Sequence, residues 1–312
     1  MARRQFRYTS DDEDSGRWDG FEFRPGDIVI STRSKSGTTW TQMICALLVF
    51  QTPDLPEPLA RLSPWLDWLT APRDEVFARL AAQRHRRFIK THTPLDGIPL
   101  DPLATYIVVG RHPLDMAVSL YHQGANLDRD RMRELTGQAG PAPAQAPRKP
   151  LRDWLVSWIA SDAAPRDHLD SLPGVLWHIS DAWSRQAPPG GEDPAVILLH
   201  YDDLVADLEG QMRRLAGLLG IEVPERTWPS LVRAATFEEM RAAAARNLPS
   251  PAGVLKDPLA FFRRGTSGAG HEVLAEPELD RYYARAAELA GPAVLGWLHR
   301  RAPAGVDSAE SG

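Results

Sequence analysis

The chain has 312 residues, of which 43% are hydrophobic and 25% are charged, an ordinary globular composition. A formal net charge of −5 excludes the broad basic surface that general nucleic-acid binding needs, while a local basic pocket for a small anion stays compatible with it. The single cysteine excludes an intrachain disulfide, and no segment resembles a secretory signal or a membrane span, so we expect a cytoplasmic protein.

Four short apolar runs alternate with amphipathic segments along the chain. This alternation is typical of an α/β fold, with a central parallel sheet covered by helices on both faces. We expect Thr38 or Thr39 to cap the first long helix and Gly220 to end the last. The predicted strands lie within 24–32, 86–94, 104–113 and 195–203. The predicted helices cover 39–51, 113–123 and 203–220.

These elements predict a single domain over residues 18–302, without internal repeats. Residues 1–17 are polar and acidic, and residues 303–312 are similarly polar, so both are predicted to be loose tails. A segment rich in proline, alanine and glycine predicts a flexible insertion at about 124–150, either a lid or a disordered loop.

The segment STRSKSGTTW (31–40) lies where the first strand turns into a helix. A helix N-terminus offers unpaired N–H groups and the positive end of a dipole, which together bind phosphate. Gly37 permits close backbone approach, and Lys35 adds a mobile cation. The lysine precedes the glycine, unlike the ATPase P-loop, so the site is only P-loop-like. The competing interpretation is an ordinary helix start with a surface lysine.

Three further features lie at predicted strand ends or turns. Arg111 ends the third strand, where ligands of open α/β sheets bind, although a salt bridge to Asp115 is the simpler alternative. The turn FFRRGTSGAG (261–270) combines two arginines with exposed loop N–H groups, which suits a phosphate or a solvated surface equally. His92 ends the second strand and is a candidate general base, or a structural histidine.

Taken together, four motifs resemble those of the PAPS-dependent cytosolic sulfotransferases, where PAPS is 3′-phosphoadenosine-5′-phosphosulfate. KSGTTW resembles the family's 5′-phosphosulfate loop, and KTHTP resembles its second strand end. IVVGRHPLDMAVSLYH resembles its 3′-phosphate segment, and FFRRG resembles its R-K-G-x-x-G turn. The resemblance covers most of the chain, with all four motifs in the family's order. They begin at residues 35, 90, 107 and 261.

The resemblance implies transfer of the PAPS sulfuryl group to a hydroxyl or amine of a small-molecule acceptor, leaving PAP. It implies that Lys35 neutralises charge on the leaving oxygen, that Lys90 contacts the sulfuryl group and that His92 accepts the acceptor's proton. The implied 5′-phosphate ligands are Ser36, Gly37, Thr38 and Thr39. The implied adenine contacts are Trp40, Tyr201, Thr236 and Phe237. The implied 3′-phosphate ligands are Arg111, Ser119, Arg263, Arg264 and Gly265. Such a transfer needs positioning and charge stabilisation, and we expect no metal.

The chain also departs from the family pattern. Ser34 and Arg33 replace a proline and an aromatic residue, and Ala235 stands where threonine is usual. The family's dimer stretch after the arginine turn is missing, which leaves the oligomeric state open.

Tryptophans in the variable segments predict an aromatic acceptor pocket or core packing, and we favour the core for Trp177 and Trp183. The other four candidates are Trp65, Trp68, Trp154 and Trp158.

Two other functions stay open at this point. The residues HYDD (200–203) after an apolar strand are compatible with the Mg²⁺ site of a P-loop kinase or NTPase. A non-catalytic PAP-binding protein is the third hypothesis, although it has no need of His92.

Overall fold

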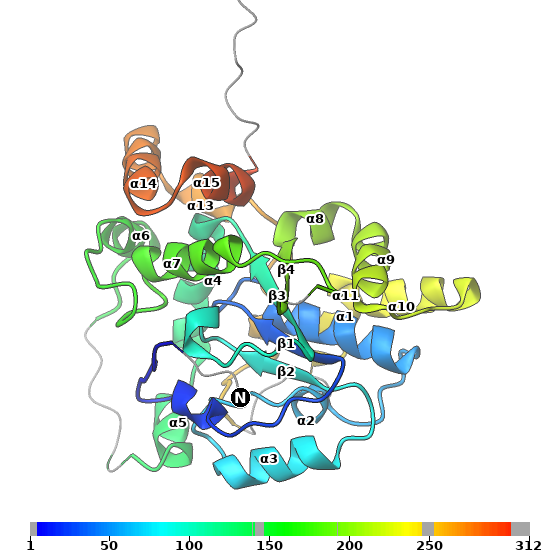
Figure 1. The fold of residues 1–312 in the computed structure, drawn as a ribbon. Coiled ribbons are helices and arrows are strands. Elements are labelled where there is room, and N and C mark those ends of the chain that lie inside the picture. Colours follow the sequence, from blue (N-terminus) through cyan, green and yellow to red (C-terminus); the bar gives the residue numbers. More distant parts are fainter. Residues whose placement is uncertain (1–4, 139, 141–146, 192, 245–252, 301–312) are drawn as a thin grey trace, which may run out of the picture.

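The four apolar runs form one parallel sheet in the order β2-β1-β3-β4, which confirms the predicted α/β fold (Figure 1). The computed structural model describes residues 5–138, 140, 147–191, 193–244 and 253–300. Ser31 at the end of β1 lies opposite Thr91 of β2, and Gly110 at the end of β3 lies opposite His200 of β4. The strands are β1 (Asp27–Ser31), β2 (Phe88–Thr91), β3 (Ala104–Gly110) and β4 (Ala195–His200).

Helices cover both faces of the sheet, because successive strand side chains point to opposite sides. Val29 packs into one hydrophobic cluster, while Ile28 and Ile30 pack into the other. The Val29 side is covered mainly by α3 (Arg73–Ala82), α4 (Pro113–Asn126), α6 (Leu151–Ile159), α7 (Leu172–Ser184), α13 (Ala269–Val273), α14 (Glu276–Leu289) and α15 (Pro292–His299). The other side is covered by α1 (Thr38–Phe50), α2 (Leu59–Leu62), α8 (Tyr201–Ala206), α9 (Leu208–Leu219), α10 (Trp228–Ala234) and α11 (Phe237–Ala242).

The remaining helices are short. They are α5 (Arg129–Leu135) and the 3₁₀ turns η1 (Ser15–Trp18), η2 (Leu95–Gly97), η3 (Glu225–Thr227) and η4 (Leu259–Phe261). Over the described ranges, every helix is too short or too polar to cross a bilayer.

Two helix starts differ from the prediction. Gly37, in a left-handed conformation, is the N-cap of α1, whereas Thr38 and Thr39 are its first two residues and make no side-chain cap. The helix predicted over 203–220 is two helices, because the Asp207 carboxylate accepts a hydrogen bond from the Gly210 N–H (2.9 Å) and starts α9 afresh. Gly220 ends α9 in the predicted left-handed conformation.

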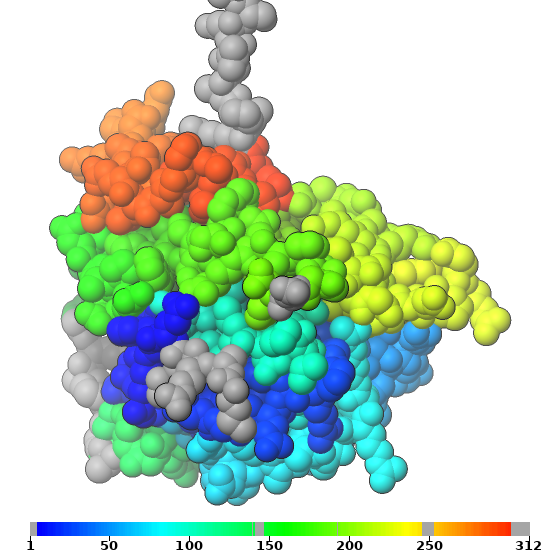
Figure 2. Space-filling model, viewed as in Figure 1, coloured from blue at the N-terminus to red at the C-terminus, as the bar shows by residue number. Residues whose placement is uncertain are grey.

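The described part of the N-terminal segment is packed, so the prediction of a loose tail over 1–17 was wrong there. Tyr8 is buried, its hydroxyl donates to an Asp96 carboxylate oxygen (2.8 Å), and the indole of Trp177 on α7 donates to that hydroxyl (3.0 Å). Figure 2 shows this blue segment lying against the green surface. The buried ring of Tyr8 and its two hydrogen bonds hold this segment in place despite the polar residues around it. Residues 1–4 of this tail lie outside the described residues.

The predicted insertion at 124–150 also contains regular structure. Helix α4 extends to Asn126, α5 follows, and Leu127 forms a bridge with Leu255. The prediction missed this helix because the Pro/Ala/Gly-rich stretch begins only after it. Residues 139 and 141–146 of the insertion, and residue 302 with the predicted tail 303–312, lie outside the described residues.

Candidate functional site

A site residue lies near the carboxyl end of each of the four strands, at the same edge of the sheet. The carboxyl ends of parallel strands meet at one edge, and ligands of open α/β folds bind there. Lys35 follows β1, Arg111 follows β3, and Tyr201 follows β4. Lys90 is the last but one residue of β2, and His92 follows that strand. These five residues line one cavity of about 600 Å³.

The loop between β1 and α1 has the backbone of an anion cradle. Lys35 has a φ of 66° and Gly37 has a φ of 110°, two left-handed residues on either side of Ser36 that turn the chain sharply into the helix. A Cβ at Gly37 would approach the Tyr201 ring to 3.2 Å, so the position favours glycine. The first N–H groups of α1 have no side-chain cap and stay available to a ligand.

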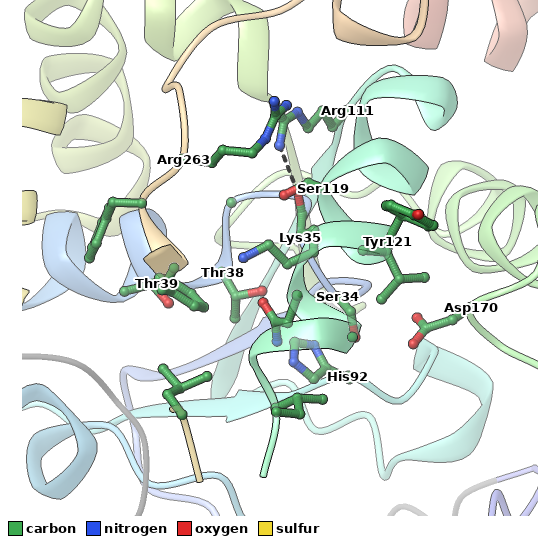
Figure 3. A pocket seen from close by; sticks show the side chains of 18 of the residues that line it. Ser34, Lys35, Thr38, Thr39, His92, Arg111, Ser119, Tyr121, Asp170 and Arg263 are labelled. Carbon is green, nitrogen blue, oxygen red and sulfur yellow. Dashed lines mark hydrogen bonds between the residues drawn. The ribbon is translucent and has the colours of Figure 1, made fainter. Parts of the chain in front are cut away.

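Three cations form what we call the cationic end of the cavity: Lys35, Arg111 and Arg263. Figure 3 shows Arg111 and Arg263 close together, with Lys35 below them. Burial lowers the pKa of Lys35 to about 7, and the neighbouring charges of Arg111, Lys90 and Arg263 lower it further. The Nε atoms of both arginines are buried without a hydrogen-bond partner in the described chain, and none of the three cations makes a salt bridge there. An anionic ligand would neutralise these unpaired cations and accept hydrogen bonds from the two buried Nε atoms.

Arg111 does not pair with Asp115, so the simpler interpretation of Arg111 was wrong. Its Nη1 donates to the Lys35 carbonyl (3.0 Å), its Nη2 donates to the Thr266 carbonyl (3.2 Å), and the guanidinium lies over the Tyr201 ring (4.0 Å). The Asp115 carboxylate instead accepts from the N–H groups of Gly268 (2.7 Å) and Gly270 (2.8 Å). Asp115 therefore fastens the arginine turn to the start of α4, a role that sequence reasoning missed.

Within the arginine turn, the two arginines have different surroundings. Arg263 is half-buried at the cavity, whereas the exposed Arg264 pairs with Glu272 (2.5 Å). Gly265 has a φ of 69°, and a Cβ there would lie 2.6 Å from the Phe237 ring, so only glycine permits this approach. Ser119 on α4 completes the lining on this side.

His92 lies at the opposite end of the same cavity (Figure 3). It is 6% exposed, and its Nδ1 makes a hydrogen bond to the Thr32 carbonyl. Because a carbonyl only accepts, Nδ1 carries the proton and Nε2 is left as an acceptor. Burial lowers the pKa of His92 well below its ordinary value, and the charges of Lys90 and Arg33 lower it further, so the ring is neutral near pH 7.

Lys90 is 7% exposed beside His92 and makes no salt bridge within the described ranges. Its Nζ lies 3.8 Å from the centroid of the Trp65 ring, which also contacts the His92 ring edge-on at 4.6 Å. Burial lowers the pKa of Lys90 to about 8, against the opposing charges of Glu13 and Asp67. The ammonium is therefore protonated at neutral pH and titrates just above it.

An aromatic wall adjoins the cationic end. Trp40 contacts Tyr201 edge-on at 5.3 Å, and its indole N–H donates to the Ala235 carbonyl (2.8 Å). Phe237 joins them in the lining. Two predicted nucleotide contacts lie outside the lining: Ser36 is buried within the loop, and Thr236 caps α11. The other predicted site residues all border the cavity.

At what we call the aromatic end, Trp65 and Trp68 line the cavity near His92, and Trp154 borders the same cavity beside Tyr121. Trp158, a fourth candidate, is buried in the core, and Trp183 packs against the core as expected. Trp177 is instead half-buried outside both hydrophobic clusters, with its indole donating to the Tyr8 hydroxyl. Sequence reasoning missed Glu13 and Asp170, which line this end. No local motif marks either residue, because each reaches the cavity through a distant segment.

A nucleoside triphosphatase site is not supported. The carboxylates of HYDD are engaged elsewhere, since Asp202 accepts from Ser267 and Asp203 pairs with Arg300, and neither lines the cavity. In the part of the chain that the structure describes, no three His, Cys, Asp or Glu side chains gather to hold a metal ion.

Comparisons with known proteins agree with this geometry. The family model described as a sulfotransferase domain matches residues 25–288. A glycolipid sulfotransferase of Mycobacterium bovis is 43% identical over 306 residues, covering 92% of this chain and 91% of that protein. Sulfotransferase 1A1 of Bos taurus is 27% identical, covering 81% and 79%.

A solved structure of retinol dehydratase with androsterone and PAP has a TM-score of 0.64 and 20% identity, covering 88% of this chain and 82% of that one, which supports the fold. The extent of the family match and the 43% identity over almost the whole chain decide the assignment. The chain belongs to the sulfotransferase family and is a sulfotransferase.

Proposed function

We propose that this enzyme takes PAPS as its sulfuryl donor and transfers the group to a hydroxyl of a glycolipid. The observation that carries the proposal is the convergence of Lys35, Arg111 and Arg263 in one cavity whose other end holds the neutral His92. A cavity with unpaired cations at one end and a proton acceptor at the other suits transfer from an anionic donor to a hydroxyl.

The residues present fit a nucleotide that carries two separate phosphates. The N-terminus of α1 and the Gly37 backbone suit one phosphate, while Arg111, Ser119 and Arg263 suit the other. Trp40 and Phe237 offer aromatic faces for a base between them. When bound, PAPS supplies a sulfuryl group on an activated phosphate. Lys35 and Lys90 border the space where charge changes during transfer, and neither has a carboxylate partner in the described chain.

His92 is the proposed general base. Its Nδ1 hydrogen bond to Thr32 holds the ring in the tautomer whose Nε2 accepts a proton. The cations around it disfavour a resting imidazolium, so the ring is ready to accept the proton from an acceptor hydroxyl at neutral pH.

The acceptor class rests on the relatives and on the lining. The 43% identical mycobacterial relatives are glycolipid sulfotransferases. Beyond the aromatic end, Leu120, Leu127 and Met132 add apolar surface from α4 and α5 that suits a lipid chain.

Thermal unfolding tests the donor. PAP raises the melting temperature more than AMP or ATP at equal concentration, because a ligand of the folded state stabilises it in proportion to its affinity. Transfer of radioactive label from PAPS to a glycolipid then tests the reaction.

An equal increase in melting temperature with AMP would contradict the proposal that Arg111 and Arg263 bind a second phosphate. PAP binding without transfer to any acceptor would favour the non-catalytic alternative.

A further inference from the structure

Two carboxyl groups lie at the aromatic end, close to the proposed base. Asp170 precedes α7, and Glu13 lies in the N-terminal segment, where its backbone forms a bridge with Trp68. Both line the cavity, although the donor requires cations and the base requires no carboxylate. Their presence therefore needs an explanation on the acceptor side.

Arg33 ties Asp170 to His92. One nitrogen of this buried guanidinium donates to an Asp170 carboxylate oxygen (2.5 Å), and another donates to the His92 carbonyl. The Trp158 indole donates to the Asp170 backbone carbonyl (2.8 Å) and fixes the residue further. The Asp170 side chain is nevertheless 40% exposed, and Figure 3 shows its carboxylate pointing toward Ser34 and His92. One oxygen is thus held by Arg33 while the other is available to a ligand.

Glu13 is less constrained. Its carboxylate makes no hydrogen bond or salt bridge to the described part of the chain. Burial raises the pKa of Glu13 to about 8, with further increases from Asp67 and Asp170 and opposing effects from Arg33 and Lys90. A carboxyl group that is mostly protonated at neutral pH both donates and accepts hydrogen bonds.

A stacked pair of tryptophans lies beside these carboxyl groups. The rings of Trp65 and Trp68 stack at 4.4 Å with an interplanar angle of 23°, and Trp65 contacts His92. The almost fully buried Lys90, which borders the cavity without a salt bridge to any described residue, completes the group. A sugar ring has apolar C–H groups for the exposed part of Trp65 and several hydroxyls for the carboxyl groups.

The charges discriminate among acceptors. An anionic acceptor is repelled by Asp170, and a protonated amine is repelled by Lys90. A neutral molecule with several hydroxyls avoids both repulsions and satisfies the free Asp170 oxygen.

We propose that Asp170, held by Arg33, and Glu13 are specificity-determining residues that hydrogen-bond the hydroxyls of a sugar ring lying beside Trp65, placing one hydroxyl at His92. This inference rests on the proposed function and names the part of the glycolipid that the enzyme recognises.

Two acceptors that share an octyl chain test the proposal: octyl β-D-glucopyranoside and 4-octylphenol. Asp170→Asn and Glu13→Leu each lower kcat/KM for the glucoside about tenfold to a hundredfold, the range expected for a lost hydrogen bond to a charged or buried carboxyl. Both variants stay within about threefold of the wild type on the phenol, which offers no second hydroxyl. The control Asp167→Asn, an exposed residue of the same loop outside the cavity, changes neither rate.

Calorimetry of glucoside binding to the PAP-bound enzyme provides a second readout. The affinity falls in the two carboxyl variants and is unchanged in the Asp167→Asn control. The PAP-induced shift in melting temperature shows whether each variant is folded, and Glu13→Leu keeps the test valid if Asp170→Asn unfolds. Equal losses on both acceptors, or none on the glucoside, would overturn the inference. So would wild-type transfer to the phenol alone or to octylamine in preference. Absence of transfer from PAPS to every acceptor would instead overturn the proposed function, and this inference with it.

Discussion

The two ends of the cavity are built in different ways. At the cationic end, Arg111 directly follows β3 and Lys35 lies in the short loop after the adjacent strand β1, and they make no salt bridge within the described residues. At the aromatic end, Asp170 is paired with Arg33, and Glu13 and Trp65 come from segments outside the sheet. Strand ends of a parallel sheet hold fixed positions, so they suit binding of a donor common to many enzymes. Loops vary independently of the sheet, so they suit selection of an acceptor.

The largest expected effect is that of His92→Ala, which changes turnover at one end of the cavity and leaves PAP binding at the other end intact. Turnover falls about a hundredfold to ten-thousandfold, because a positioned base contributes that much. PAP affinity barely changes, since His92 lies away from the cationic end. Labelled transfer and calorimetry measure the two quantities. The control His85→Ala, which lies outside this cavity, keeps wild-type turnover. A parallel loss of PAP affinity would contradict the division between the ends.

Arg263→Ala and Arg264→Ala compare neighbours within the cationic end. Arg263 has no salt-bridge partner in the described chain, and its replacement weakens PAP binding about tenfold to a hundredfold, as expected for a charge-assisted hydrogen bond. Arg264 is exposed and already paired with Glu272, so its replacement changes affinity about twofold. Calorimetry with PAP measures both variants. Similar losses would show that the pair with Glu272 opens on binding.

The pH dependence of PAP binding tests the charge of Lys35. Its pKa of about 7 means that the ammonium is protonated below pH 7, and a phosphate favours the protonated form. Affinity therefore falls as pH rises above 7, by at most about tenfold per pH unit for one proton. Lys35→Arg removes this decline because arginine stays protonated, while ionisation of the ligand affects both proteins equally. Identical profiles would exclude Lys35 as the titrating group.

Tyr8→Phe tests the support beneath the aromatic end and has the smallest expected effect. The free energy of unfolding falls by about 1–2 kcal/mol, because the hydroxyl bridges Asp96 and Trp177. PAP affinity stays unchanged and serves as the control. Urea denaturation measures the loss of stability. An unaltered unfolding curve would mean that the N-terminal segment is not held by this residue.

The sequence predicts the site residues that follow a strand, but it does not predict those that depend on contacts between distant segments. Lys35, His92 and Arg111 were found because each closely follows an apolar run whose strand is recognisable locally. Asp170 was missed because nothing near it in the chain indicates that Arg33 lies beside it, 137 positions away. Glu13 was hidden in an acidic segment that appeared to be a tail. Ser36 and Thr236 occur in matching motifs, yet Ser36 is buried within its loop, Thr236 caps α11, and neither lines the cavity.

The sequence by itself determined the four strands, the helices that follow three of them and the cationic loop residues, because hydrophobic periodicity and helix-start chemistry act over a few neighbouring residues. Only the tertiary structure decided which charges stay unpaired, which carboxyl groups meet the base and how the N-terminal segment packs. Burial and electrostatic coupling depend on residues that are distant in the chain and adjacent in space, and these two effects set the pKa values of Lys35, His92 and Glu13.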